Sequence, residues 1–139
     1  MTPETIGRDV LSRLNAGDVA GAAAHFADDC KLHQALPEVQ GRAGFVQIAS
    51  KLRAAFPDLH YELVELVADA SRVAMVSTVT GTHTGRLAFV QFPIEATGAR
   101  VKFTQIRVLT IAGDKIVEDH GCTDQAAFLR QLGMKIVQA

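Results

Sequence analysis

The sequence predicts an α+β domain in which three N-terminal helices pack on the concave face of a cone-shaped, curved antiparallel sheet. Two observations support this fold class. Apolar residues recur with helical spacing in most of the first 56 residues, and β-branched and aromatic segments separated by turns fill residues 59–123. A chain of 139 residues can bury a core of its own, so we expect residues 1–139 to form one domain.

The first and third helices have clear start and stop signals. Thr2-Pro3-Glu4 places a hydroxyl at the N-cap, a proline at the first helical position and an acid in the first turn, and Gly17 is expected to end the helix. Another helix follows Gly41. It must end before Pro57, because the residue preceding a proline is pushed out of the α region.

A short helix and a strand are expected between these two helices. Asp18 caps the helix, and the buried side of this helix would include Phe26. The strand is predicted over Cys30–Leu36, with Pro37 closing it.

The next part of the chain predicts two paired strands, Leu59–Ala68 and Arg72–His83. Along the first strand the apolar positions change face between Leu63 and Val64, which is the effect of a β-bulge that bends a sheet. The segment Arg86–Ala99 is apolar without a clean period. It is interpreted as either an extra strand pair or an apolar flap.

A long hairpin comes last, with strands Val101–Ala112 and Lys115–Thr123 joined by a turn at Gly113-Asp114. Asp124 then caps a final helix. One face of the first strand mixes polar and apolar side chains: Phe103, Gln105, Arg107, Leu109 and Ile111. On the second strand one face holds Val117, Asp119, Gly121 and Thr123, and the other holds Glu118, His120 and Cys122. Buried polar groups without partners are costly, so the hairpin is predicted to form the wall of a polar-floored pocket at the open end of the cone.

Composition excludes several classes of protein. The chain is 48% hydrophobic and 21% charged, and its net charge of −1 with scattered basic residues argues against a nucleic-acid partner. No apolar run approaches the ~18 residues of a membrane-spanning helix. Two cysteines make no disulfide framework, which favours a reducing compartment, and we expect a cytoplasmic protein.

Five motifs stand out along the chain: Ala54-Ala55-Phe56-Pro57-Asp58-Leu59, Gly81-Thr82-His83-Thr84-Gly85, Pro93 through Thr97-Gly98, Lys115-Ile116-Val117-Glu118 and Gln131-Leu132-Gly133. In this order they resemble the motifs of the SnoaL-like polyketide (ester) cyclases. This family belongs to the nuclear-transport-factor-two-like superfamily, a cystatin-like cone shared with ketosteroid isomerase and scytalone dehydratase. The resemblance implies ring closure by intramolecular aldol condensation, with no metal and no cofactor.

The resemblance also implies which residues form the site. Asp119 matches an acidic residue on the last strand that acts as general acid/base, and His33 matches a histidine common on the first strand. Asp124 is a second matching carboxylate, although its position also suits an N-cap. The residues expected to contact substrate are Tyr61, His83, Phe103, Gln105, Arg107 and His120.

Some of these residues have a second interpretation. Asp119 could instead form a cross-strand salt bridge with Arg107. His120 alternates with Asp119 and is expected on the outer face, where it could lie in an interface. No metal site is expected from the two Cys/His pairs. On a strand, Cys30 and His33 point to opposite faces, and His120 and Cys122 share a face but supply only two ligands.

Three functions remain open at this point. The first is an ester-cyclase or isomerase-type enzyme that uses carboxylate chemistry on a small apolar carbonyl compound. The second is a module that binds a hydrophobic ligand without chemistry. The third is an epoxide hydrolase of the limonene-epoxide type, which needs a carboxylate–arginine–carboxylate arrangement from Asp119, Arg107 and one of Glu65 or Glu118. For each of them a homodimer through the sheet is expected.

Overall fold

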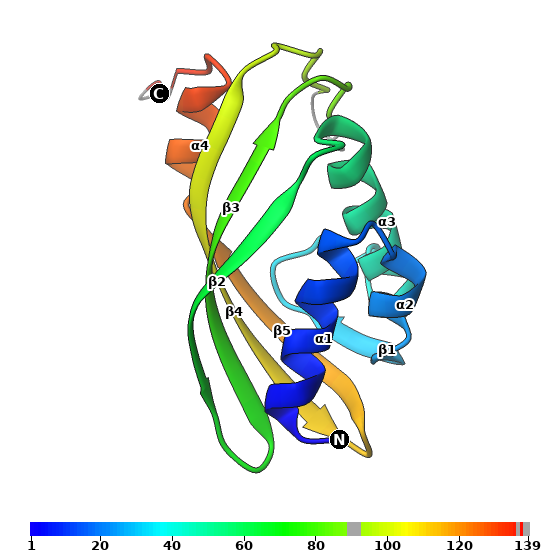
Figure 1. The fold of residues 1–139 in the computed structure, drawn as a ribbon. Coiled ribbons are helices and arrows are strands. Elements are labelled where there is room, and N and C mark those ends of the chain that lie inside the picture. Colours follow the sequence, from blue (N-terminus) through cyan, green and yellow to red (C-terminus); the bar gives the residue numbers. More distant parts are fainter. Residues whose placement is uncertain (89–92, 136, 138–139) are drawn as a thin grey trace.

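A computed structural model describes residues 1–88, 93–135 and 137 of the chain (Figure 1). In these residues the order of elements is the predicted one: two helices, a strand, a third helix, four successive strands and a short last helix. The elements are α1 (Pro3–Asn15), α2 (Val19–Ala23), β1 (Phe26–Leu32), α3 (Gly41–Ala55), β2 (His60–Ala68), β3 (Arg72–Thr82), β4 (Arg100–Ala112), β5 (Lys115–Thr123) and α4 (Gln125–Gln131).

The strands form one sheet in the order β1-β5-β4-β3-β2. Strands β2 to β5 are antiparallel neighbours, whereas β1 lies at the edge and runs parallel to β5. Figure 1 shows a twisted, curved sheet with α1, α2 and α3 on one side of it. Helix α1 contacts β2, β3 and β4, α2 contacts α1 and α3, and α3 contacts β1. The α+β prediction is confirmed, with the parallel edge strand as a difference from a purely antiparallel sheet.

The bounds of β1 also differ from those predicted. The strand begins at Phe26, which pairs with Ile116 and stacks on Phe45 of α3 with 4.1 Å between ring centroids. It ends at Leu32, because the side chain of Gln40 binds both the N–H and the carbonyl oxygen of that residue, at 2.8 Å and 3.0 Å. His33 therefore follows the strand instead of lying within it.

Two register shifts interrupt the antiparallel pairings of the sheet, in addition to one between β1 and β5. Leu63 pairs with Ser77 and Glu65 with Val76, so Val64 is the extra residue on β2, as the change of face predicted. A second irregularity lies between β4 and β5, where Thr110 pairs with Glu118 but Ile111 pairs with Ile116. The sequence analysis did not predict this one. It allows Ile116 and Asp119, three residues apart, both to be buried.

The predicted turn of the long hairpin at Gly113-Asp114 is present between β4 and β5. Gly113 and Asp114 have φ angles of 57° and 60°. Two successive residues in the left-handed region are the feature of a type I′ turn, which suits the twist of a tight hairpin. The turn brings Asp119 opposite Leu109 and Gly121 opposite Arg107.

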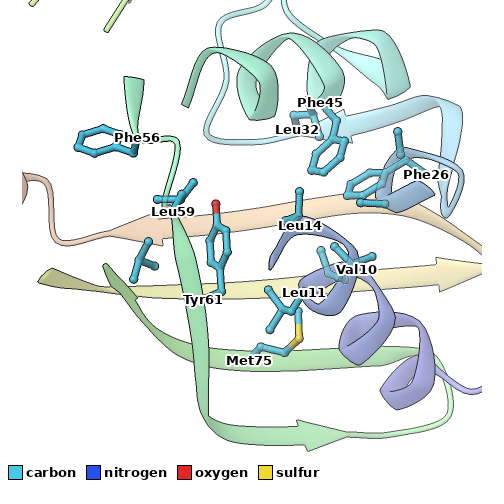
Figure 2. Packing of buried hydrophobic residues seen from close by; sticks show 14 of the residues in the cluster. Val10, Leu11, Leu14, Phe26, Leu32, Phe45, Phe56, Leu59, Tyr61 and Met75 are labelled. Atoms are coloured by element: carbon cyan, nitrogen blue, oxygen red, sulfur yellow. The ribbon is translucent and has the colours of Figure 1, made fainter. Parts of the chain in front are cut away.

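The core fills the space between α1 and the sheet (Figure 2), where Val10, Leu11 and Met75 are almost fully buried. The segment 86–99 was predicted as a strand pair or a flap, and its described residues include an antiparallel bridge between Leu87 and Ile94. Both side chains are buried and belong to the core. Phe89, Val90 and Phe92 of this segment lie outside the described residues.

Across the described ranges, no helix combines the length and the apolar character that crossing a membrane requires.

Candidate active site

A cavity of about 620 Å³ opens between the concave face of the sheet and helix α3. Its volume lies within the range of pockets that hold small organic molecules. Most of the wall is apolar. The larger apolar side chains that line it are Leu14, Leu32, Phe45, Ile48, Leu52, Phe56, Leu59, Val79, Phe103 and Phe128.

An ion pair lies on the floor of this cavity. Asp119 has no exposed surface, and Arg107 is 8% exposed. The guanidinium donates two hydrogen bonds to the carboxylate, from Nη2 to Oδ2 and from Nε to Oδ1, the second at 3.3 Å. Taking two charges out of water costs several kcal/mol per ion, so only this bidentate pairing makes their burial tolerable. The predicted cross-strand salt bridge is present.

The strand register explains how the pair forms. Arg107 lies directly opposite Gly121, while Asp119 is two residues further along β5. The long arginine side chain spans this diagonal to reach Asp119. The space beside Gly121 is taken by Gln34, whose Cδ would lie 3.1 Å from a Cβ at that position. The guanidinium carbon also lies 5.9 Å from the ring centroid of Phe45, within the range of a cation–π contact.

Electrostatics keep Arg107 charged. Burial alone would lower the pKa of Arg107, but the charge of Asp119 and its hydrogen bonds outweigh burial and raise that pKa above its ordinary value. The cavity floor therefore holds a fixed guanidinium charge beside the Asp119 carboxyl group.

Tyr61 enters the cavity from β2, with its side chain almost buried. Figure 2 shows its ring near Leu59 and Leu14, with the hydroxyl directed away from β2. The backbone of Tyr61 is held by Asn15, whose amide accepts from its N–H at 2.7 Å and donates to its carbonyl at 2.9 Å. Burial raises the pKa of the phenol, partly offset by Arg107 and Arg53, so the hydroxyl stays protonated as a donor.

Polar side chains also line the cavity. Gln105 on β4 was predicted here, but Lys51 on α3 was not. Ile48 and Leu52 on the same helix are only half-buried because they cover the cavity. The other polar residues in the lining are Gln34, Gln47, Cys122, Thr123 and Gln125.

Five predicted site residues thus meet in the cavity, and three histidines do not. The five are Tyr61, Phe103, Gln105, Arg107 and Asp119. His33 and His120 stack on each other outside the cavity lining, with 3.5 Å between ring centroids. His120 is exposed, as expected for the outer face.

His83, expected to contact substrate, is fully buried and lies outside the cavity lining. Its Nδ1 accepts a hydrogen bond from the Thr97 N–H at 3.2 Å, and its ring stacks on Phe56. Its Nε2 is buried and has no partner among the described residues. His83 therefore packs between Thr97 and Phe56 and does not line the cavity.

Asp119 is the single carboxylate that the described residues contribute to the cavity lining. Asp124 caps α4 by accepting from the Ala127 N–H at 3.1 Å. Glu65 is exposed, and Glu118 pairs with His33. The described residues therefore do not assemble the carboxylate–arginine–carboxylate arrangement that the epoxide hydrolase hypothesis needs.

Solved structures with the same fold have related sequences. AclR from Streptomyces galilaeus, a proposed hydroxylase, is 26% identical over 98% of this chain and 88% of its own, with a TM-score of 0.80. A SnoaL-like polyketide cyclase from Agrobacterium tumefaciens is 26% identical over 96% of this chain and 99% of its own, at a TM-score of 0.76. IdmH from Streptomyces antibioticus, a proposed polyketide cyclase, is 22% identical over 96% of this chain and 100% of its own, with a TM-score of 0.79. At this identity the likeness shows a shared fold and nothing more.

No protein of curated function matches the sequence. The family comparison gives a direct answer: the sequence profile described as SnoaL-like polyketide cyclase matches residues 6–132, which is nearly the whole chain. The resemblance in the motifs and the curved-sheet fold agree with it. The chain belongs to the SnoaL-like polyketide cyclase family.

Proposed function

We propose that this protein closes a ring in a small polyketide-like ester by intramolecular aldol condensation, with Asp119 as the general acid/base. The observation that carries the proposal is the position of the Asp119 carboxylate, fully buried on the floor of a largely apolar cavity. A carboxylate that is shielded from water beside fixed donors is arranged as catalytic bases commonly are. The structure supports Asp119 for this role and not His33, which lies outside the cavity lining.

The reaction needs only proton transfers and carbon–carbon bond formation. The Asp119 carboxylate takes a proton from a carbon between two carbonyl groups, and the C–H electron pair becomes an enolate. The enolate carbon attacks a second carbonyl carbon of the same molecule, whose π electrons move to its oxygen. That alkoxide then takes the proton back from Asp119, so atoms and electrons balance without an external oxidant or reductant.

Two donors are placed to stabilise the developing oxyanion. The Arg107 guanidinium carries five N–H groups, and its two bonds to Asp119 leave others for a ligand oxygen. The protonated Tyr61 hydroxyl enters the same cavity. Fixed donors in a site shielded from water stabilise a negative charge more strongly than water does at the moment of reaction. The aromatic and aliphatic wall suits the carbon skeleton of the substrate.

A second function, ligand binding without chemistry, is favoured by one observation. The two hydrogen bonds from Arg107 hold Asp119 as a neutralised pair, and a neutralised carboxylate is a weak base. Each carboxylate oxygen has two lone pairs, so Asp119 keeps acceptor capacity beyond those bonds. The two functions differ in one respect: both predict ligand binding, and only the enzyme predicts turnover.

The test uses a linear aromatic poly-β-ketoester and follows the cyclised product by mass spectrometry. We expect the natural chain to form product and Asp119→Asn to lose about 100-fold or more of the rate, the range for a general base. Asp124→Asn is the matched control: it changes a nearby carboxylate outside the cavity, and asparagine is as good an N-cap as aspartate. Equal rates for the two variants would reject Asp119 as the base.

We also propose the homodimer through the outer face of the sheet. Ile106 on β4 is 44% exposed there and pairs with Val76 of β3, which adds a neighbouring apolar side chain. Sedimentation of the natural chain and of Ile106→Glu tests this. A dimer that dissociates in the variant is expected, and a monomeric natural chain would contradict it. Cytoplasmic location stays a prediction.

A further inference from the structure

Three side chains with metal-binding atoms meet on the outer side of β5, away from the cavity. They are His33, which follows β1, and Glu118 and His120 on β5. The Nε2 atom of His33 lies 3.2 Å from Oε2 of Glu118, and one ligand atom from each of the three lies within 4.8 Å of the others. None of the three belongs to the cavity lining.

The parallel pairing of β1 and β5 produces this cluster. Leu32 pairs with Asp119, so the next residue on each chain, His33 and His120, lie side by side. The His33 N–H donates to the Asp119 carbonyl at 3.0 Å, which fixes the backbone at this point. Glu118 precedes His120 by two residues and shares its face of the strand. Two adjacent backbone segments therefore present the three side chains together.

We propose that His33, Glu118 and His120 bind a divalent transition-metal ion of the zinc type. Two imidazole nitrogens and one carboxylate oxygen are a donor set that suits Zn²⁺ and its first-row neighbours, whereas Mg²⁺ and Ca²⁺ prefer oxygen ligands alone. Three protein ligands also leave a coordination position for water or another ligand. The expectation of no metal site considered two cysteine–histidine pairs and left out Glu118.

The geometry needs only a small adjustment to accept the ion. Zinc bonds of about 2.0–2.1 Å place neighbouring ligand atoms roughly 3.3 Å apart, which the His33–Glu118 distance already matches. The two imidazole rings are nearly parallel, at 10°, so they must tilt until both nitrogens point at one ion. Both rings have exposed surface that leaves room for this movement. Lys31 lies opposite Glu118 and is exposed, so its ammonium group can remain in solvent.

The test is a calorimetric titration of the full chain with ZnCl₂. We expect one zinc ion per chain, with affinity reduced about tenfold or more in each of His33→Ala, His120→Ala and Glu118→Gln. The matched control is His60→Ala, which removes an exposed histidine from β2 and should bind as the natural chain does. MgCl₂ should give no specific heat of binding.

Two results would overturn the proposal. One is the absence of zinc binding by the natural chain at millimolar ZnCl₂. The other is an equal loss of affinity in His60→Ala and His33→Ala, which would indicate scattered binding by surface imidazoles. Thermal denaturation with and without ZnCl₂ is the second measurement: the ion should raise the melting temperature of the natural chain and leave that of His33→Ala unchanged.

Discussion

Glu118 and Asp119 are consecutive residues on β5, and each carboxylate pairs with a nitrogen base, but in opposite environments. Asp119 is completely buried and binds the Arg107 guanidinium through two hydrogen bonds. Glu118 is 44% exposed and lies 3.2 Å from the imidazole of His33. A buried charge depends on its partner, because water cannot replace that partner. An exposed carboxylate can use water instead, and so it remains available to another cation.

The largest effect should come from breaking the buried pair. Arg107→Met leaves the Asp119 charge without its partner, so we expect the free energy of unfolding to fall by about 3–5 kcal/mol in urea titrations. The double variant Arg107→Met/Asp119→Leu replaces the pair by apolar side chains of similar size. It should recover most of the loss, since such replacements are often neutral. A single variant as stable as the natural chain would show that the pair is not buried as described.

A smaller effect should follow from removing the Tyr61 hydroxyl. Tyr61→Phe keeps the ring that packs near Leu59 and Leu14 and removes one donor to the oxyanion. We expect cyclisation to slow by about 10- to 100-fold, somewhat less than for loss of a full oxyanion-hole donor. Stability should change by about 1 kcal/mol or less, because Tyr61 borders the cavity and Asn15 holds it through its backbone N–H and carbonyl, which the substitution leaves in place. An unchanged rate would remove Tyr61 from the mechanism.

His83 gives a prediction about pH. Burial lowers its pKa, so the folded protein holds this imidazole neutral while the unfolded chain binds a proton near pH 6.5. The unfolded state binds more protons, so the contribution of His83 to the free energy of unfolding is fully present above about pH 6.5. This contribution falls as the pH drops below that value, by up to about 1.4 kcal/mol per pH unit. Comparing the free energy of unfolding at pH 7.5 and 5.5 should show a smaller drop in His83→Gln than in the natural chain. An equal drop in the free energy of unfolding of the two proteins would show that His83 is not the group responsible.

The smallest effect should come from Glu118→Gln without metal. This substitution breaks the exposed His33–Glu118 contact, and exposed ion pairs contribute about 0–1 kcal/mol. Chemical denaturation should give a stability within about 0.5 kcal/mol of the natural chain. A loss of unfolding free energy as large as that of Arg107→Met would mean that the difference in exposure between Glu118 and Asp119 does not set how much each ion pair stabilises the fold.

Local rules predicted much of the fold. The N-caps at Thr2, Asp18 and Asp124, the end of α3 before Pro57 and the bulge at Val64 all follow from short-range chemistry, and the structure contains each of them. The alternation along β4 also placed Gln105 and Arg107 on the cavity face.

The differences come from contacts between distant segments. Phe26 follows a helical stretch, and it begins a strand because it pairs with Ile116 of β5 and stacks on Phe45 of α3. His33 and His120 are 87 positions apart, and their meeting depends on the parallel register of β1 and β5. The burial of His83 depends on Thr97 and Phe56. No local pattern encodes these pairings.

The central claim is that Asp119 removes a proton from carbon, and hydrogen–deuterium exchange measures that step alone. The ligand is a 1,3-diketone too short to cyclise, incubated with the natural chain in D₂O and followed by proton NMR. We expect deuterium uptake at the carbon between the carbonyl groups to be at least about 100-fold faster than in buffer. This uptake should be retained in Asp124→Asn and lost in Asp119→Asn. Saturable binding of the diketone with exchange at the buffer rate would contradict the enzymatic account and leave a binding protein.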